Sequence, residues 1–167
     1  MEVSLILVPT DFSDCALNSL RYARDIARKQ GARLLLLHVI NRKEAGTCAS
    51  YSKVPLEDVL ERLTNQAKQV FRKLLASWDG ADLVEETIVS VGTPFQEIAV
   101  KARSYKVDLI IMGGYGSRGK GGQIEEIFFG STVEKVVRLL PCPVLCVPVG
   151  WPEEFRPEDV STGQQEG

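Results

Sequence analysis

The fold of this chain is decided by one stretch, 107-VDLIIMGGYGSRGKGGQIEEIFFGST-132. Its apolar first part (107–112) leads directly into glycine-rich sequence, and it closes on Ser131 and Thr132, where a helical pattern begins. Glycines allow backbone N–H groups to converge on an anion, and the N-terminus of a helix adds unpaired N–H groups with a partial positive charge. The stretch therefore predicts a strand, a phosphate-binding loop and a helix, in that order.

Further apolar segments predict the other strands of a sheet. They are rich in Val, Ile and Leu and cover residues 3–8, 33–40, 83–91 and 144–147. Continuous apolar runs are typical of parallel strands that helices cover on both faces. The segment 83–91 is interrupted by Glu85, Glu86 and Thr87, so we expect it at an edge of the sheet.

Helical patterns lie between these strands and begin near residues 14, 55, 94 and 131. Ser13 is a suitable N-cap for the first helix, and Gly31 is a suitable C-terminal stop. Ser131 and Glu134 have the spacing of a capping box for the last helix. Residues 41–54 show no periodicity, and we predict a mobile loop there.

Alternation of strands and helices with short turns indicates an α/β fold with a single open five-stranded parallel sheet and helices on both faces. Right-handed crossovers and the ranking of strand apolarity give the order 3-2-1-4-5. Ligands of such sheets bind beyond the carboxyl ends of the strands where the winding reverses, here between the first and fourth strands. The loops that begin at Pro9 and Gly113 should therefore face one crevice.

The composition of the 167-residue chain excludes several classes of protein. Twenty Lys and Arg against twenty-two Asp and Glu residues argue against a protein that binds nucleic acid through its phosphates. Four cysteines without a CxxC pair, and a single His, give no zinc spacing. The N-terminal apolar run stops at Pro9, too soon for a membrane span. We expect a cytoplasmic protein with reduced thiols and no nucleic-acid or membrane partner.

The chain divides into one domain and a short tail. Residues 1–150 hold all the predicted strands and helices, whereas residues 151–167 are polar, acidic and contain proline. We predict an α/β domain followed by a disordered acidic tail.

Two familiar glycine motifs match the decisive stretch only in part. Residues 114–119 fit GxGxxG, but they follow a late strand and no helix opens at the third glycine. Residues 114–120 fit the start of GxxxxGK[ST], but Gly121 stands where the motif needs a hydroxyl for Mg²⁺. A different kind of phosphate site is therefore favoured. His38 lies in an apolar strand and is expected to be a hydrogen-bonded core residue, not a catalytic base.

A likeness to a known family is carried by four segments, ILVPTDFSDCALNSLRYA, LLLLHVI, DLIIMG and GSTVEKVVRLLPCPVLCV. Together they resemble the universal stress protein family along nearly the whole chain, from Leu5 to Pro148. The resemblance implies a nucleotide-binding α/β domain that forms a homodimer and holds ATP, with Mg²⁺, at the crevice. It also implies the residues of that site, which are Pro9, Thr10, Asp11, Val39, Met112, Gly113, Gly116, Gly130, Ser131 and Thr132.

The sequence departs from the family pattern inside the glycine loop. The spacer between Gly116 and Gly130 is longer than the family spacing, so the glycines beside Lys120 are alternatives to Gly116 as phosphate contacts. Arg118 and Lys120 either close over a triphosphate or belong to a solvated flap.

Function is predicted from a phosphate cradle that has no recognisable catalytic set. The leading hypothesis is an ATP-binding stress-response protein that acts as a dimeric switch or adaptor, with at most slow ATP hydrolysis, no catalytic residue and no metal site of its own. The alternatives are a protein-interaction module of the same fold that binds no nucleotide but an unknown protein partner, and a nucleotide-processing enzyme. An apolar edge strand at 144–147 that ends in Pro148 predicts dimerisation by antiparallel pairing with its copy.

Overall fold

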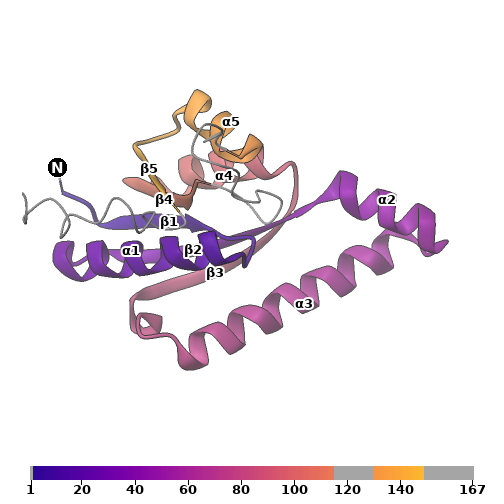
Figure 1. The fold of residues 1–167 in the computed structure, drawn as a ribbon, viewed down its shortest axis with the longest axis horizontal. Helices are drawn as coiled ribbons and strands as arrows, with labels where there is room; N and C mark the ends of the chain where they lie inside the picture. Colours follow the sequence, from indigo (N-terminus) through magenta and orange to yellow (C-terminus); the bar gives the residue numbers. More distant parts are fainter. Residues whose placement is uncertain (1, 115–129, 149–167) are drawn as a thin grey trace, which may run out of the picture.

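The structure is a computed structural model that describes residues 2–114 and 130–148. Its elements are β1 (Leu5–Pro9), α1 (Asp14–Gln30), β2 (Arg33–Asn41), α2 (Arg42–Ser52), α3 (Leu56–Ser77), the 3-10 turn η1 (Ala81–Leu83), β3 (Val84–Gly92), α4 (Pro94–Ser104), β4 (Leu109–Gly113), α5 (Ser131–Leu139) and β5 (Val144–Val147). They form a single sheet between two layers of helices (Figure 1). This confirms the predicted α/β fold.

The five strands are all parallel and follow the order β3-β2-β1-β4-β5. The predicted order is confirmed, with β1 in the centre and β3 and β5 at the two edges. β3 carries a bulge at Glu85, because Leu34 pairs with Val84 and Leu35 with Glu86. A bulge strengthens the local twist, which suits an exposed edge strand that bears carboxylates.

Alternate residues of the strands face two separate cores. Ile6 and Val8 of β1 point toward α1 and α3, where they share a cluster with Leu20 and Phe71. Leu7 faces the opposite core, which includes residues of α4 and α5. All three β1 residues are fully buried, as expected for a strand that helices cover on both faces (Figure 1).

β2 and β3 continue past the end of β1. The last pair between β1 and β2 is Pro9 with Leu37, whereas β2 and β3 pair as far as Asn41 with Gly92. This two-stranded extension carries α2 and the N-terminal half of α3, which together project beyond the sheet (Figure 1). We call these two segments the arm.

The prediction of a mobile loop at residues 41–54 is wrong, because α2 occupies most of that range. Asn41 caps the helix: its Oδ1 accepts a hydrogen bond from the N–H of Glu44 at 3.4 Å, and its Nδ2 donates to Glu44 Oε1 at 2.8 Å. The buried face consists only of Ala45 and Ala49. Two alanines are too small a pattern to be recognised as one face of a helix, so tertiary packing and the cap decide the structure here.

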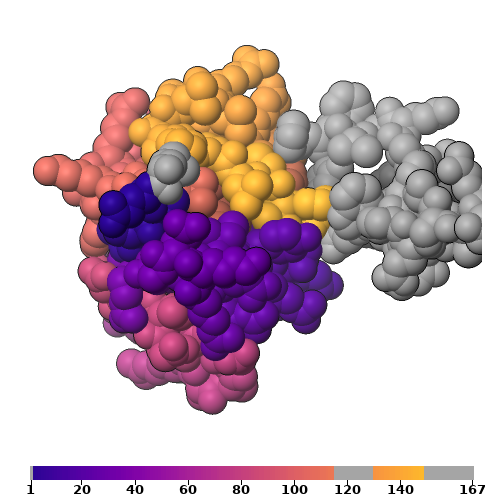
Figure 2. Space-filling model, turned by 90° about the vertical axis from the view of Figure 1, so that its left-hand side faces the viewer, coloured from indigo at the N-terminus to yellow at the C-terminus, as the bar shows by residue number. Residues whose placement is uncertain are grey.

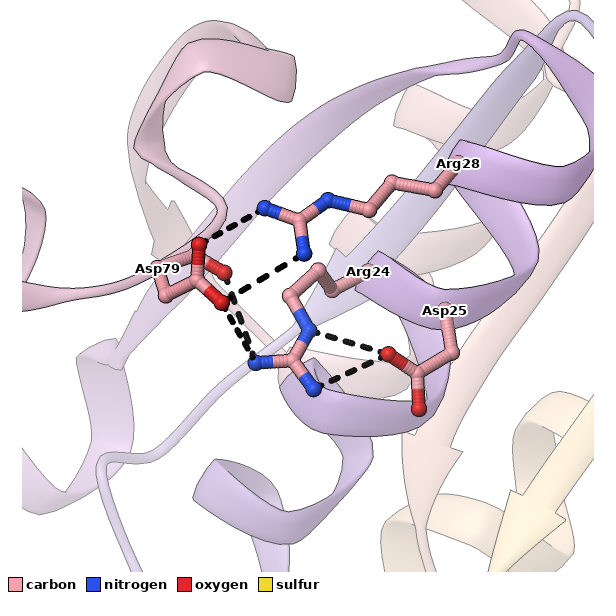
Figure 3. Close-up of polar contacts among 4 residues, drawn as sticks. All are labelled: Arg24, Asp25, Arg28 and Asp79. Atoms are coloured by element: carbon pink, nitrogen blue, oxygen red, sulfur yellow. Dashed lines mark hydrogen bonds and ion pairs between the residues drawn. The ribbon is translucent and has the colours of Figure 1, made fainter.

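Ion pairs tie the end of α1 to the turn after α3 (Figure 3). The carboxylate of Asp79 lies 2.7 Å from Arg28 Nη2 and 3.3 Å from Arg24 Nη1, and Arg24 also pairs with Asp25 at 2.9 Å. The hydrogen bond from Arg28 lowers the pKa of Asp79 and raises that of Arg28. Because Asp79 is well exposed, these pairs join two elements with little gain in stability.

β5 and α5 form the outer border of the sheet next to α1. Figure 2 shows this border in orange and yellow beside the purple surface of α1.

The four cysteines are free thiols. In the part of the chain that the structure describes, no helix combines the length and apolar character needed to cross a membrane. The predicted acidic tail at 151–167, together with Gly116, Arg118 and Lys120, lies outside the described residues.

Candidate functional site

The sheet opens between β1 and β4 at its carboxyl edge. These two strands pair at Ile6 with Leu109 and at Leu7 with Ile110. Further along, each pairs with its outer neighbour instead: β1 reaches Pro9 opposite β2, and β4 reaches Gly113 opposite β5. The chain also changes direction here, because α1 packs on one face of the sheet and α5 on the other. The two strands therefore part at the predicted point of reversal, and we call this opening between them the crevice.

The turn after β1 forms one wall of the crevice. The N–H of Thr10 donates to Leu37 O at 2.8 Å, and Thr10 Oγ1 accepts from the N–H of Phe12 at 3.0 Å. Asp11 Oδ1 accepts from the N–H of Ser13 at 3.0 Å. Ser13 in turn caps α1, since its Oγ accepts from the first-turn N–H of Ala16. The exposed Asp11 carboxylate is thus held in a turn built by side-chain hydrogen bonds.

His38 supports this turn from β2. Its Nδ1 lies 2.8 Å from the carbonyl oxygen of Thr10, which confirms the predicted hydrogen-bonded histidine. Its ring stacks on Phe12 with centroids 4.6 Å apart, and Phe12 meets Phe71 of α3 edge to face at 5.1 Å. Phe12 has a φ of 63°, a left-handed conformation that is rare for a bulky residue. No pattern in the sequence indicates that backbone conformation.

The turn after β4 forms the opposite wall, and its two described ends meet. The N–H of Gly114 donates to Val147 O at 2.8 Å, and the N–H of Gly130 donates to Gly114 O at 3.0 Å. The decisive stretch thus leaves the sheet and returns to it at one place. The bond between Gly130 and Gly114 brings the start of α5 beside the end of β4, where Gly113 lies.

Gly113 is a glycine for a reason that the sequence did not reveal. A Cβ at this position would lie 2.7 Å from Cys15 Sγ and 3.0 Å from the backbone carbonyl carbon of Cys15. The first turn of α1 therefore packs directly against the end of β4. At Gly114 the nearest atom would be Val147 O at 3.5 Å, which is an ordinary contact. The close packing against Cys15 is therefore sufficient to explain why residue 113 is a glycine.

The predicted capping role of Ser131 is wrong. Gly130 is the N-cap of α5, with an extended backbone (φ −56°, ψ 147°) and no side-chain cap, and Ser131 is the first helical residue. The first helical hydrogen bond runs from the N–H of Glu134 to Gly130 O at 3.1 Å. The preceding N–H groups have no carbonyl within the helix to bond, so the helix start presents donors to an anion.

Apolar residues occupy the carboxyl ends of β1, β2 and β4 beside the crevice. Val39 and Met112 lie on the same face of the sheet and belong to the same cluster of hydrophobic residues. Pro9 is buried at the end of β1, and Met112 is 5% exposed. An apolar base between a carboxylate and a helix N-terminus suits a ligand that has a flat apolar ring, hydroxyl groups and an anionic end.

Nearly all the predicted site residues thus lie at the carboxyl ends of β1, β2 and β4 or at the start of α5. Gly116 is outside the described residues. Residues 2–114 and 130–148 contain no group of three or more His, Cys, Asp or Glu side chains arranged to hold a metal ion. The supporting residues Phe12, Cys15 and Gly114 were missed, since only the tertiary contacts identify them.

Comparisons with known proteins give matches along most of the chain. The model of the universal stress protein family matches residues 3–148. The chain is similar to universal stress protein YxiE of Bacillus subtilis, with 34% identity over 148 residues that cover 85% of this chain and 97% of the relative. It is also similar to universal stress protein MJ0577 of Methanocaldococcus jannaschii, with 30% identity over 155 residues that cover 85% of this chain and 93% of the relative.

Solved structures share the fold as well. A structure of MJ0577 has a TM-score of 0.73 and 29% identity, and the match covers 89% of this chain and 97% of that chain. A universal stress protein that was solved in complex with cAMP has a TM-score of 0.55 and 25% identity, with 90% and 100% of the two chains covered.

Proposed function

Since the chain belongs to the universal stress protein family, we propose that it binds an adenine nucleotide in the crevice between β1 and β4. The observation that carries the proposal is the opening of the sheet past Leu7, with the turn after β1 on one side and the start of α5 on the other. The similar protein solved with cAMP supports an adenine nucleotide as the class of ligand.

The roles of the site residues follow from their chemistry. Asp11 accepts hydrogen bonds from the ribose hydroxyls, because a carboxylate carries no donor. Val39 and Met112 contact the adenine ring through their apolar surface. The N–H groups of Ser131 and Thr132 donate to the phosphates at the start of α5.

ATP is the nucleotide that we propose, with Mg²⁺ held by its phosphate groups. We propose a switch or adaptor and not an enzyme. In this proposal His38 serves the turn after β1, since its Nδ1 bonds the carbonyl oxygen of Thr10 and its ring stacks on Phe12. In this proposal ATP hydrolysis is at most slow. The signal depends on whether the protein has a nucleotide bound.

A homodimer through β5 is part of the proposal. β5 is an edge strand, and large apolar side chains on it and on the end of α5 are exposed; these are Val137, Leu139, Leu140 and Leu145. Leu140 alone is 64% exposed. Antiparallel pairing of β5 with its copy would cover both this apolar surface and the unpaired backbone of the edge.

A second candidate is an interaction module of the same fold that binds a protein partner and no nucleotide. The observation that favours it is the exposed end of the arm, where Tyr51 is 86% exposed and Val54 is 38% exposed. Aromatic side chains at such exposed sites are common anchors of protein interfaces.

Two measurements test nucleotide binding, and a third tests the dimer. Acid extraction of the purified protein followed by mass spectrometry should release an adenine nucleotide, and titration of nucleotide-free protein with ATP and Mg²⁺ should produce heat. Absence of both results would contradict the proposal and leave the interaction module. Light scattering at micromolar concentration should give the mass of a dimer; a monomer would contradict the β5 interface.

A further inference from the structure

The turn after β1 depends on a hydrogen bond to a carbonyl oxygen that has little access to water. Thr10 is 6% exposed, and its carbonyl oxygen lies 2.8 Å from His38 Nδ1. A carbonyl oxygen can only accept, so Nδ1 carries the proton and donates. Without this donor the oxygen would stay buried and unsatisfied, and the turn would have to move to reach water.

The neighbouring backbone is held in a conformation that it would not adopt alone. Phe12 has a φ of 63°, and an aromatic residue in the left-handed region persists only where its surroundings enforce it. Its ring is enclosed between the His38 ring at 4.6 Å and Phe71 of α3 at 5.1 Å. His38 thus acts on the turn twice, through its donor and through its ring.

The restrained segment includes the exposed carboxylate of Asp11. Asp11 lies between Thr10, which bonds His38, and Phe12, which stacks on it. Its Oδ1 position is further fixed by the N–H of Ser13 at 3.0 Å. A change in the path of the backbone at Thr10 or Phe12 would therefore move the Asp11 carboxylate.

We propose that His38 is a positioning residue for the nucleotide site: its Nδ1–H and its stack with Phe12 hold the turn in the geometry that presents Asp11. His38 touches no ligand in this proposal. The consequence for nucleotide affinity rests on the proposed function, whereas the effect on the turn itself does not.

Three variants separate the donor from the ring. His38→Asn places an amide donor where Nδ1 stands but loses the ring, His38→Phe retains a ring without the donor, and His38→Leu removes both. Hydrogen exchange of the nucleotide-free protein measures the turn through the N–H groups of Phe12 and Ser13. The N–H groups of Leu35 and Leu36 in the central sheet report on global unfolding.

The expected result is faster exchange in the turn of His38→Leu, by about tenfold, with a similar loss of ATP affinity and unchanged exchange in the sheet. If the hydrogen-bond donor contributes more than the ring, the exchange rate of the turn in His38→Asn should be closer to the wild-type rate than that in His38→Phe. Unchanged exchange in the turn of His38→Leu would overturn the proposal. If His38→Leu also speeds exchange in the central sheet, the test passes to His38→Asn and His38→Phe. Exchange of the turn at the wild-type rate in both of these variants would overturn the proposal. A wild type that binds no nucleotide would refute the proposed function and leave the exchange result to decide the role of His38.

Discussion

The two ends of the β1–β4 pair are built in opposite ways. At the amino end, the carboxylate of Asp108 accepts hydrogen bonds from the N–H of Ser4 at 2.8 Å, from Ser4 Oγ at 2.8 Å and from the N–H of Leu5 at 3.0 Å. At the carboxyl end, pairing stops after Leu7 and the strands turn to their outer neighbours. The same two strands are therefore fastened at one end and parted at the other, which allows a site to form without loosening the sheet.

The two turns at the carboxyl end are constrained in two different ways. The turn after β1 is held by side chains, whereas the turn after β4 is held by backbone hydrogen bonds and by the close approach of α1 to Gly113. Substitutions should therefore act differently at the two turns and at the fastened end. The largest effect is expected where a side chain would be forced into the packed backbone.

Gly113→Val should lower the free energy of unfolding by about 3 kcal/mol, because its Cβ would lie 2.7 Å from Cys15 Sγ and 3.0 Å from the Cys15 backbone. Urea denaturation measures the change. Gly114→Ala is the matched control, since its Cβ would meet only Val147 O at 3.5 Å, and it should change stability by less than about 0.5 kcal/mol. Equal stability of the two variants would contradict the packing role of Gly113.

Asp11→Ala should weaken ATP binding by about 10- to 100-fold, because it removes a charged acceptor from the crevice. Calorimetric titration measures the affinity. Asp11→Asn keeps an oxygen that can accept from the N–H of Ser13 and loses only the charge, so it should fall between Asp11→Ala and the wild type. Full affinity in Asp11→Asn would mean that the charge of Asp11 does not contribute to nucleotide binding.

Asp108→Asn should reduce the free energy of unfolding at pH 7 by about 1–2 kcal/mol, because charge-assisted bonds to Ser4 and Leu5 are weakened. Bonds from the backbone and hydroxyl of Ser4, then from the backbone of Leu5, hold the pKa of Asp108 below its ordinary value. Its contribution is therefore present above the unfolded-state pKa of about 3.9 and is lost as the pH falls through the lower folded-state pKa.

Denaturation of the wild type and Asp108→Asn at several pH values tests this linkage. The difference in stability should shrink below about pH 4. Glu85→Gln is a suitable control, because Glu85 is an exposed carboxylate on the edge strand. A difference that persists unchanged in acid would show that the Asp108 charge does not fasten the strands.

Asp79→Asn should have the smallest effect. Its melting temperature should differ from that of the wild type by no more than the reproducibility of the measurement. Its carboxylate also accepts from several donors, but they come from the long side chains of Arg24 and Arg28, and Asp79 is well exposed. Thermal melts at low and high salt measure the effect. A loss as large as that of Asp108→Asn would contradict the distinction between anchored backbone donors and solvated arginines.

Sequence alone was sufficient for the sheet but only partly for the site. Unbroken apolar runs such as Leu34 to Leu37 identify strands because both faces are buried, and the strand order then locates the crevice. Side-chain conformation and tertiary contacts supply the rest. Nothing in the sequence indicates a left-handed Phe12, and a glycine that packs against Cys15 looks the same as one that faces a phosphate.

The helix boundaries show the same limit. α2 has only Ala45 and Ala49 on its buried face, which is too weak a pattern to distinguish from a loop. At α5 the spacing of Ser131 and Glu134 suggested a side-chain cap, but Gly130 takes the capping position with its backbone. A cap depends on dihedral angles, which the spacing of residue types does not determine.

The extension of β2 and β3 past the end of β1 is the structural connection between the sheet and the arm. A two-stranded ribbon twists more freely than a sheet of five strands, so the segment from His38 to Asn41 and its partner on β3 can set the direction of the arm. The register of β1, β4 and β5 does not involve that ribbon. The ribbon does, however, carry His38 and Val39, so a change in the direction of the arm would also move the residues that support the turn after β1 and the apolar side of the site.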